Sequence, residues 1–262
     1  TMQKKKGKVK SKVVHASTDS IKSITIPLPP IEIQNEIVRI LDCLTALAAE
    51  LTTELTARKQ QYEFYRDKLL SFDHLTPKER EGAGVRWMTL DSVCSIVRGE
   101  RITKADLSND GPYPVISGGY HPMGHYNRYN RNANMVTIAQ YGSAGYVDWQ
   151  KKPFWANDVC YTLYSNEMII ERYLYHVLKL RQNELYSLRT EAIPAHLSFK
   201  ALTSFLIPVP SFETQKNIVK ILDEFENLCY DLEKGIPAEI EARKKQYEYY
   251  RDKLLSFEEA QP

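Results

Sequence analysis

The densest group of side chains that could do chemistry lies between Gly118 and Asn134. This run carries three tyrosines, two histidines, two arginines and four asparagines. It is too polar for a buried core and too rich in aromatic residues for an ordinary loop, and tyrosines suit wet, adaptable recognition surfaces. Side chains that donate, accept or carry positive charge favour binding over catalysis. The alternative for each charged residue of the run is a solvated surface charge.

Motifs that would supply catalysis are absent or incomplete. The run Asn109 to Tyr113 reads Asn-Asp-Gly-Pro-Tyr; it lacks the double proline with which adenine methyltransferases grip a flipped base and is typical of a turn. Gly142-Ser143-Ala144-Gly145 is too short for a dinucleotide fingerprint or a phosphate loop. The four cysteines form no CxxC pair, so neither a zinc site nor a disulfide framework is indicated. We expect a chain that binds rather than catalyses, with no metal and no cofactor.

The bulk composition is that of an ordinary cytoplasmic protein. The 262 residues are 43% hydrophobic and 26% charged, and the scattered cysteines favour reduced thiols. No apolar run is long enough to span a membrane, and the basic run Lys4 to Lys6 has no apolar stretch behind it, so it is not a secretory signal. A net charge of +2 neither demands nor excludes nucleic acid, because clustering of charge matters more than its sum.

An internal repeat organises the chain. Residues 26–42 return as residues 207–223, and residues 57–72 match residues 242–257 at 14 of 16 positions. The second copy has gained four residues near Gly235 to Ala238. A period this long is not that of a solenoid, so the repeat is a duplicated module with a different segment between its copies.

Each copy is predicted to form a long helix. Large side chains recur at alternating steps of four and three residues, which makes a heptad seam. Ser211 is the expected N-cap of the second helix. The four extra residues continue the seam as a stutter, and Gly235 and Pro237 should kink the helix there. Two such helices in one chain should pack antiparallel, although the periodicity equally allows a stalk that joins two chains.

The seam residues are also our candidates for subunit interfaces. They are Ile37, Leu41, Leu44, Leu51, Leu55, Tyr62 and Tyr65 in the first copy, and Ile218, Leu222, Phe225, Leu232, Tyr247, Tyr250 and Leu254 in the second.

The segment between the helices predicts a mixed α/β domain. Strand-like runs are expected at residues 113–116, 135–139, 145–149, 159–164 and 202–207, with one helix over 168–188. Residues 1–25 look like the end of another such domain, because His15-Ala16-Ser17 precedes the first helix as His196-Leu197-Ser198 precedes the second. The predicted fold class is α+β: a globular mixed α/β domain plus two long helices that pair as an antiparallel coiled coil.

The expected division of the chain has six parts. They are the remnant of a first domain (1–25), the first long helix (26–72), a linker (73–86), the globular domain (87–206), the second long helix (207–257) and a tail (258–262).

The sequence resembles the specificity subunits of bacterial type I restriction–modification systems over essentially its whole length. The helices carry the resemblance through their Ile-Pro-x-Pro starts, Gln34 and Gln215, the Ile-Val-(Arg/Lys)-Ile-Leu-Asp runs and the Tyr-Arg-Asp-Lys-Leu-Leu-Ser-Phe ends. The globular domain adds the matching segments Tyr113–Ile116, Gly118-Gly119, Pro122–Gly124, Tyr126-Asn127, Gly142–Gly145 and Ala192–Pro194. The family alternates two target-recognition domains with two conserved helices, whereas this chain has one complete recognition domain, as in a shortened form.

The resemblance implies a non-catalytic, DNA-binding specificity subunit that reads half of a bipartite target and scaffolds the modification (methyltransferase) subunits. The restriction (motor/nuclease) subunit would join through the complex. A shortened member is expected to form a homodimer; a heterologous pairing and a non-functional fragment are the alternatives. No membrane partner is expected. The alternative is a coiled-coil interaction protein whose globular head does not read DNA; an enzyme with an unrecognised site is a third possibility. Salt-dependent, sequence-selective binding to double-stranded DNA separates the first two.

DNA reading needs cations that grip the backbone together with donors and acceptors at base edges. On that basis the expected DNA-binding residues are Arg98, Arg101, Lys104, Tyr120, His121, His125, Tyr126, Asn127, Arg128, Arg131, Gln140, Tyr141, Ser143, Lys151, Lys152, Arg189 and His196. The basic N-terminal run from Lys4 to Lys12 could also touch phosphates, or it could be a disordered tail.

Overall fold

The computed structural model describes residues 22, 26–72, 76, 78, 84–231 and 234–257. The chain divides into two compact units, one of residues 1–50 with 241–262 and the other of residues 51–240. Several predicted parts fall outside the described residues: the remnant at 1–25 except Lys22, the 258–262 tail and the seam residue Leu232. Of the 73–86 linker, only residues 76, 78 and 84–86 are described. None of the described helices is both long and apolar enough to cross a membrane.

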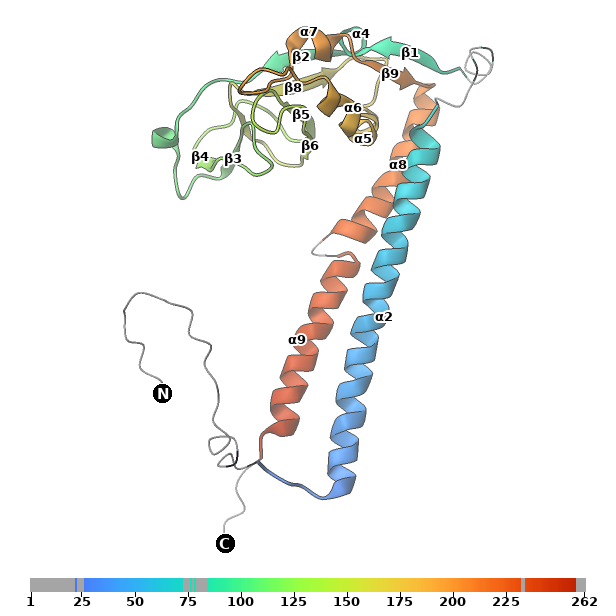
Figure 1. The fold of residues 1–262 in the computed structure, drawn as a ribbon, viewed down its shortest axis with the longest axis vertical. Coiled ribbons are helices and arrows are strands. Elements are labelled where there is room, and N and C mark those ends of the chain that lie inside the picture. Colours follow the sequence, from blue (N-terminus) through green and yellow to red (C-terminus); the bar gives the residue numbers. More distant parts are fainter. Residues whose placement is uncertain are drawn as a thin grey trace. The chain divides into compact units, whose positions relative to one another are not determined.

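The globular domain (residues 85–209) is built on three small sheets (Figure 1). The four-stranded sheet has the order β2–β8–β5–β6 with antiparallel neighbours. A three-stranded sheet has the order β4–β3–β7, and β1 pairs with β9 where the chain enters and leaves the domain. The strands are β1 (Arg86–Thr89), β2 (Cys94–Arg98), β3 (Tyr113–Ile116), β4 (His125–Tyr126), β5 (Met135–Ala139), β6 (Val147–Gln150), β7 (Trp155–Ala156), β8 (Cys160–Ser165) and β9 (Leu206–Val209).

One face of the four-stranded sheet is covered by helix α5 (Glu171–Leu180). Val136 and Ile138 of β5 are fully buried in the same core as Leu174 and Leu178 of α5. Because side chains alternate along a strand, Thr137 of β5 points to the opposite face of the sheet. The remaining short helices are α4 (Leu90–Val93), the 3₁₀ turn η1 (Lys104–Asp106), α6 (Gln182–Ser187) and α7 (Phe199–Thr203).

Within the 51–240 unit, the second half of helix α2 (Ile31–Leu70) packs against helix α8 (Phe212–Tyr230). Tyr65 stacks on Phe225 with ring centroids 5.5 Å apart, and Tyr62 meets Tyr230 edge-on at 6.0 Å. The lower number of one helix meets the higher number of the other, so the two helices run antiparallel as predicted.

Within the other unit, the start of α2 lies beside helix α9 (Ile236–Leu255). One groove is lined by Leu44 and Ala48 together with Arg243 and Tyr247, and another by residues 26–38 together with Leu255 and Phe257. This pairing is antiparallel as well.

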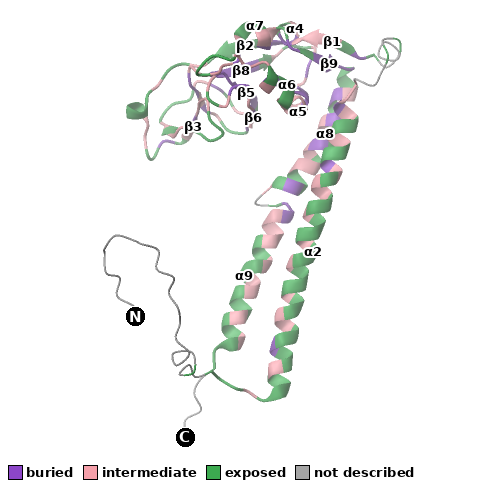
Figure 2. Ribbon diagram, in the orientation of Figure 1, coloured by how far each residue is buried: buried purple, intermediate pink, exposed green. Residues whose placement is uncertain are grey.

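The seam prediction agrees with the burial of the helices. All seven seam residues of the first copy are buried or half-buried, and the exposed side chains of α2 lie on its other faces (Figure 2). Six seam residues of the second copy are described, and of these only Tyr250 is exposed, at 37%.

The sequence predicted one kinked helix for the second repeat, whereas the structure has two separate helices. Helix α8 ends at Tyr230 and α9 begins at Ile236. A Cβ at Gly235 would lie 2.6 Å from the carbonyl oxygen of Asn227 and 2.7 Å from that of Asp231, so the chain folds back on the end of α8 where only glycine fits. Residues 206–209 form β9, and the helix starts only after Ser211, whose hydroxyl accepts the Thr214 N–H at 3.2 Å as the predicted N-cap.

Predictions inside the globular domain hold for most strands and fail in two places. The helix expected over 168–188 is α5 and α6, with a change of direction at Arg181. The strand expected over 202–207 is helix α7 followed by β9, because the Ser198 hydroxyl accepts the Ala201 N–H and caps a short helix. Strands β1, β2, β4 and β7 were not predicted; β4 and β7 have two residues each, too few for a periodic pattern.

Candidate DNA interface

Three loop segments of the globular domain meet at one place, which we call the three-loop surface (segments 117–122, 140–146 and 189–197). The Ser143 N–H donates to the Gly118 carbonyl at 2.7 Å, and the Leu197 N–H donates to the Gln140 carbonyl at 2.9 Å. Tyr141 forms a β-bridge with His196 and stacks on its ring at 5.3 Å. Sequence segments far apart in the chain therefore share one surface.

Two glycines allow the loops to approach this closely. A Cβ at Gly118 would lie 2.3 Å from the Tyr141 carbonyl oxygen, and one at Gly142 would lie 2.6 Å from the Gly118 carbonyl oxygen. Gly142 also has a φ of +70°, which side chains other than glycine rarely adopt. The Gly-Gly and Gly-Ser-Ala-Gly segments therefore serve backbone contact between loops.

Polar side chains hold the third loop in place. The Thr190 hydroxyl lies 2.9 Å from Nδ1 of His196, and the Thr190 N–H donates to the His196 carbonyl at 2.9 Å. Nε of Arg189 donates to the Ala144 carbonyl at 2.6 Å, and its guanidinium lies over the Tyr186 ring. The predicted binding residues Arg189 and His196 are thus half-buried and fixed by the loops.

A second group of segments joins residues 98–102 to residues 126–131 and 154–157. The Trp155 indole N–H donates to the Glu100 carbonyl at 2.9 Å, and its ring meets Tyr126 edge-on at 5.1 Å. The Asn130 side chain accepts the Ala156 N–H at 2.7 Å and donates to the Ala156 carbonyl at 3.1 Å. Part of the polar run at residues 118–134 therefore holds neighbouring segments of the domain together.

Two predicted DNA-binding residues lie inside the domain. Arg131 is 8% exposed and donates to the Thr162 hydroxyl at 3.3 Å and to the carbonyls of Asn130 and Arg98 at 2.8 and 2.9 Å. Gln140, which directly follows β5, is 9% exposed. Both side chains are therefore buried, which corrects their expected place on the surface, and their part in DNA binding stays a prediction.

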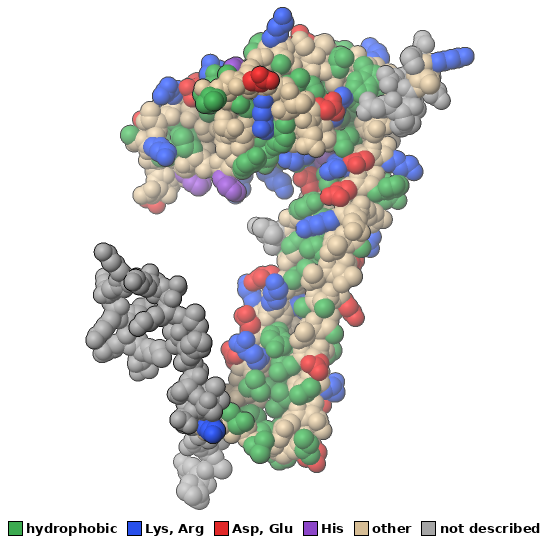
Figure 3. Space-filling model, in the orientation of Figure 1, with side chains coloured by type: hydrophobic (Ala, Val, Ile, Leu, Met, Phe, Trp, Pro, Cys, Tyr) green, Lys and Arg blue, Asp and Glu red, His purple; other side chains and the backbone are tan. Residues whose placement is uncertain are grey.

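The other predicted residues remain accessible. The half-buried ones are Tyr126, Tyr141, Ser143, Arg189 and His196, and the exposed ones are Arg98, Arg101, Lys104, Tyr120, His121, His125, Asn127, Arg128, Lys151 and Lys152. On the face drawn in Figure 3, Lys and Arg side chains are interspersed with Asp and Glu along the helices.

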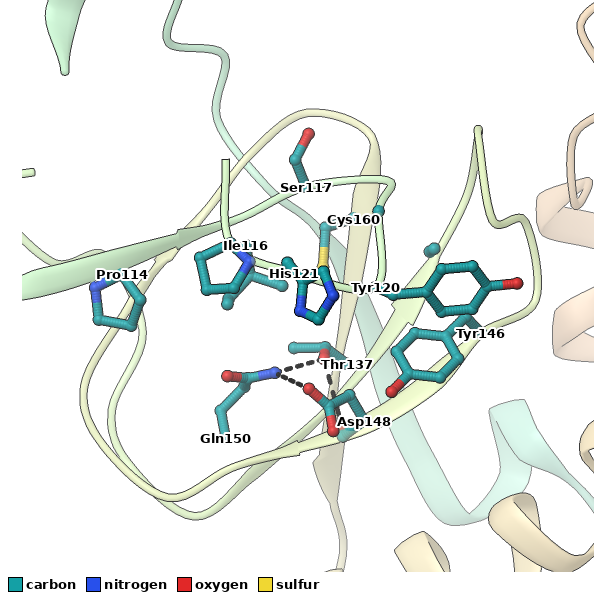
Figure 4. A pocket seen from close by; sticks show the side chains of 13 residues that line it. Pro114, Ile116, Ser117, Tyr120, His121, Thr137, Tyr146, Asp148, Gln150 and Cys160 are labelled. Carbon is teal, nitrogen blue, oxygen red and sulfur yellow. Dashed lines mark hydrogen bonds between the residues drawn. The ribbon is translucent and has the colours of Figure 1, made fainter. Parts of the chain in front are cut away.

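A cavity of about 80 Å³ lies between the 117–122 loop and strands β5 and β6. Figure 4 shows the Gln150 amide hydrogen-bonded to the Thr137 hydroxyl and to the Asp148 carboxylate, with Tyr120 and His121 of the loop also lining the cavity. The two bonds measure 3.1 and 3.0 Å. Tyr146 meets Tyr120 edge-on at 4.8 Å, and burial together with the Asp148 charge raises the pKa of Tyr146. Asp148 and Gln150 were not among the predicted site residues; the pattern that could have indicated them is their alternation with Val147 and Trp149 in one strand.

One group of described residues has metal-ligand chemistry. His176, Asp223 and Glu226 have ligand atoms within 4.8 Å of one another. Arg172 binds both carboxylates, with Nε 2.7 Å from Asp223 and Nη2 in contact with Glu226. The Arg172 guanidinium already pairs with both carboxylates, so we interpret the group as an ion-pair network rather than a cation site.

The chain matches the family described as type I restriction modification DNA specificity domain over residues 1–58 and 84–242. It is 37% identical to the EcoR124I/EcoR124II specificity subunit of Escherichia coli, over 92% of this chain and 65% of that protein. It is 36% identical to the putative type I specificity subunit S.MpnORF615P of Mycoplasma pneumoniae, over 89% of this chain and 93% of that protein.

Solved structures agree on the fold. The S subunit from M. genitalium superposes with a TM-score of 0.65 at 18% identity, over 87% of this chain and 62% of that one. The HsdS subunit from Thermoanaerobacter tengcongensis gives 0.58 at 20% identity, over 88% and 60%. The α+β prediction and the resemblance to specificity subunits are confirmed, and the family's name is that of a specificity component rather than of a catalyst. The chain therefore belongs to the family of type I restriction–modification DNA specificity subunits.

Proposed function

We propose that this chain reads one half of a bipartite target in double-stranded DNA and carries the modification subunits of a type I system. Residues 87–206 would be the target-recognition domain. The observation that carries the proposal is the three-loop surface, where Tyr120, Tyr141 and Ser143 meet Arg189 and His196 from distant parts of the sequence. Hydrogen-bonding side chains on loops held by a rigid scaffold are the usual means of base readout.

Phosphate contacts would come from the exposed cations around this surface. Arg98 ends β2, Arg101 and Lys104 follow it, Arg128 lies between β4 and β5, and Lys151 with Lys152 follows β6. Each cation that neutralises a phosphate adds about one unit to the dependence of log K on log salt. The cytoplasm, where DNA and reduced thiols are found, is the proposed location.

Two equivalent exposed aromatic sites on the helices, each beside a lysine, support docking of two modification subunits. Phe64 is 60% exposed beside Lys68 in the first copy, and Tyr249 is 59% exposed beside Lys253 at the matching position of the second. Our sequence candidates Tyr62 and Tyr65 face α8 instead. Each site combines an aromatic ring with a neighbouring cation, a combination suited to a residue that anchors a protein interface. The restriction subunit would join through this complex.

The start of α2 supports a second reading head. Ile26 and Leu28 are 71% and 81% exposed, whereas their repeat equivalents Ile207 and Val209 are 0% and 2% exposed beneath the globular domain. Hydrophobic side chains gather at this end of α2 and α9 (Figure 3), where a groove of about 420 Å³ is lined by Ile37, Val38 and Phe257 among others. We propose that a second globular domain of the same kind covers this surface, supplied by another copy of the chain in a homodimer.

A methylation map tests the proposal. The chain is co-expressed with its modification subunits and N6-methyladenine is located across the host DNA. A bipartite motif with a fixed gap is expected, and inversely related half-sites would support the homodimer. Absence of methylation in a complex shown to assemble would contradict DNA reading. Substituting Phe64→Ala and Tyr249→Ala together should reduce assembly with the modification subunits, while Glu63→Ala on the same exposed stretch should not.

A further inference from the structure

We infer that Arg172 is a positioning residue: with Asp223 and Glu226 it locks the angle between the globular domain and helix α8, and thereby fixes the spacer length that the assembled subunit accepts. The inference rests on the proposed function, because a spacer exists only for a two-headed reader. All contacts in the argument lie within the 51–240 unit.

Helix α5 of the globular domain shares an apolar core with α8, to which Leu174 and Leu178 of α5 and Ile218 and Leu222 of α8 belong, and two polar contacts add to it. The first is Gln215, whose fully buried amide accepts the Ile170 N–H at 2.8 Å and donates to the carbonyls of Met168 and Pro210, each at 3.0 Å. Gln215 lies at the beginning of α8 and opposite the beginning of α5, and its side chain makes these three hydrogen bonds.

The second polar contact is the Arg172 network. Its guanidinium donates to Asp223 at 2.7 Å and contacts Glu226, and Nε2 of His176 lies 2.9 Å from the same Asp223 oxygen. The guanidinium also lies 4.8 Å from the Trp149 ring centroid and 4.7 Å from that of Tyr175. Arg172 is 15% exposed and His176 is fully buried, whereas Asp223 is 33% exposed, so the network is partly shielded from water. A forked cation held by two carboxylates and two rings has a single geometry.

The separation of the two polar contacts gives the lever arm. Gln215 and Asp223 are eight positions apart on α8, which corresponds to about 12 Å along the helix. Slack of about 1 Å at the second point would turn the domain by about 5° around the first. A domain of this size extends about 25 Å from such a joint, so its far loops would move by about 2 Å. That displacement is a large part of the 3.4 Å or so between base pairs, so a loose joint should weaken the discrimination between spacers that differ by one base pair.

The test compares variants in the complete modification complex by methylation mapping. Arg172→Leu and Asp223→Asn should raise methylation at sites whose spacer differs by one base pair by about tenfold or more, the size of one lost mismatch penalty, with the half-site bases unchanged. Arg39→Leu is the matched control, because Arg39 makes an ion pair of 2.6 Å with Glu36 on the exposed surface of α2. Leu185→Ala, which removes a fully buried side chain from the globular domain, controls for stability. Both controls should keep the wild-type spacer.

The outcomes separate the two proposals. A wild-type complex that methylates no bipartite motif contradicts the proposed function, and the positioning role with it. A wild-type complex with a fixed spacer, together with Arg172→Leu and Asp223→Asn variants that keep it, refutes the positioning role alone. Broadening by Leu185→Ala to the same degree would also refute it, because general loss of stability would then be the cause. Should Arg172→Leu fail to assemble, Arg172→Lys keeps the charge but cannot span both carboxylates, and the same broadening is expected.

Discussion

Substituting Arg131 by alanine should destabilise the globular domain without removing a phosphate contact. The guanidinium donates to the Thr162 hydroxyl and to the carbonyls of Asn130 and Arg98. Thr162 is fully buried, and each buried acceptor left without its donor costs about 1 kcal/mol. We therefore expect a loss of about 3 kcal/mol in the free energy of unfolding. For a chain of this size that corresponds to a fall of about 6–12 °C in melting temperature.

Arg128 provides the comparison, because it lies three residues away and is fully exposed. Arg128→Ala should change the free energy of unfolding by less than about 0.5 kcal/mol and reduce the salt dependence of DNA binding by about one unit. Urea denaturation followed by circular dichroism and DNA titrations at several salt concentrations measure both quantities. If Arg131→Ala melts like the wild type and loses a unit of salt dependence, the assignment of Arg131 to the interior is wrong.

Three further predictions follow from burial, charge and backbone geometry. Burial raises the pKa of Cys94 and Cys160 to about 12, so at neutral pH iodoacetamide should label exposed Cys43 and leave those two thiols unmodified until the chain unfolds; mass spectrometry of the folded protein measures this, and equal labelling of all three would contradict the core. Burial raises the pKa of Asp223, but the hydrogen bonds from His176 and Arg172 outweigh burial, so the pKa lies below its ordinary value of 3.8. Its stabilising contribution is then present above pH 4 or so and lost as the pH falls through the lower folded pKa, so the stability gap between wild type and Asp223→Asn in urea should close in acid, and a gap independent of pH would refute the ion pair. Gly142→Ala should cost about 1–3 kcal/mol because of its positive φ and the nearby Gly118 carbonyl, whereas Gly119→Ala, whose Cβ would meet no atom closer than 3.5 Å, should be neutral; similar melting temperatures for the two would show that the loops do not need glycine at 142.

The helical part of the fold could be predicted because its cause is local. A seam of steps of four and three residues requires one face of a helix to be covered, and Leu41, Leu51 and Tyr62 are covered accordingly. The break in the second copy could not be read from the same pattern. The seam continues through the four extra residues, whereas the backbone turns there, where Gly235 approaches two carbonyl oxygens of α8 and that of Asp231. Periodicity describes side chains and is silent on a contact made by the main chain.

The candidate site was harder to predict because burial decides the role of a polar residue. Arg128 and Arg131 belong to the same run and have the same chemistry, yet one is exposed and the other holds three segments together. The difference arises from β8, whose Thr162 meets Arg131 across 31 positions of sequence. Asp148 and Gln150 were missed for the converse reason, since two polar residues in a short strand give no sign that a cavity covers them.

Gln34 and Gln215 show how far a repeat can carry such an argument. Both amides donate to a proline carbonyl five residues earlier, at 2.7 Å for Gln34 and 3.0 Å for Gln215, so the local structure repeats with the sequence. Gln215 makes two more hydrogen bonds, to Met168 and Ile170 of the globular domain, and is fully buried, whereas Gln34 is half-buried. The same residue type at the same helical position therefore has unused hydrogen-bonding capacity beside exposed Ile26 and Leu28. A second globular domain that bound there would complete at Gln34 the contacts that Gln215 already makes. Gln34→Ala should accordingly weaken the proposed homodimer, measured by analytical ultracentrifugation, without lowering the melting temperature of the globular domain, whereas unchanged association would argue against this surface as the seat of the second head.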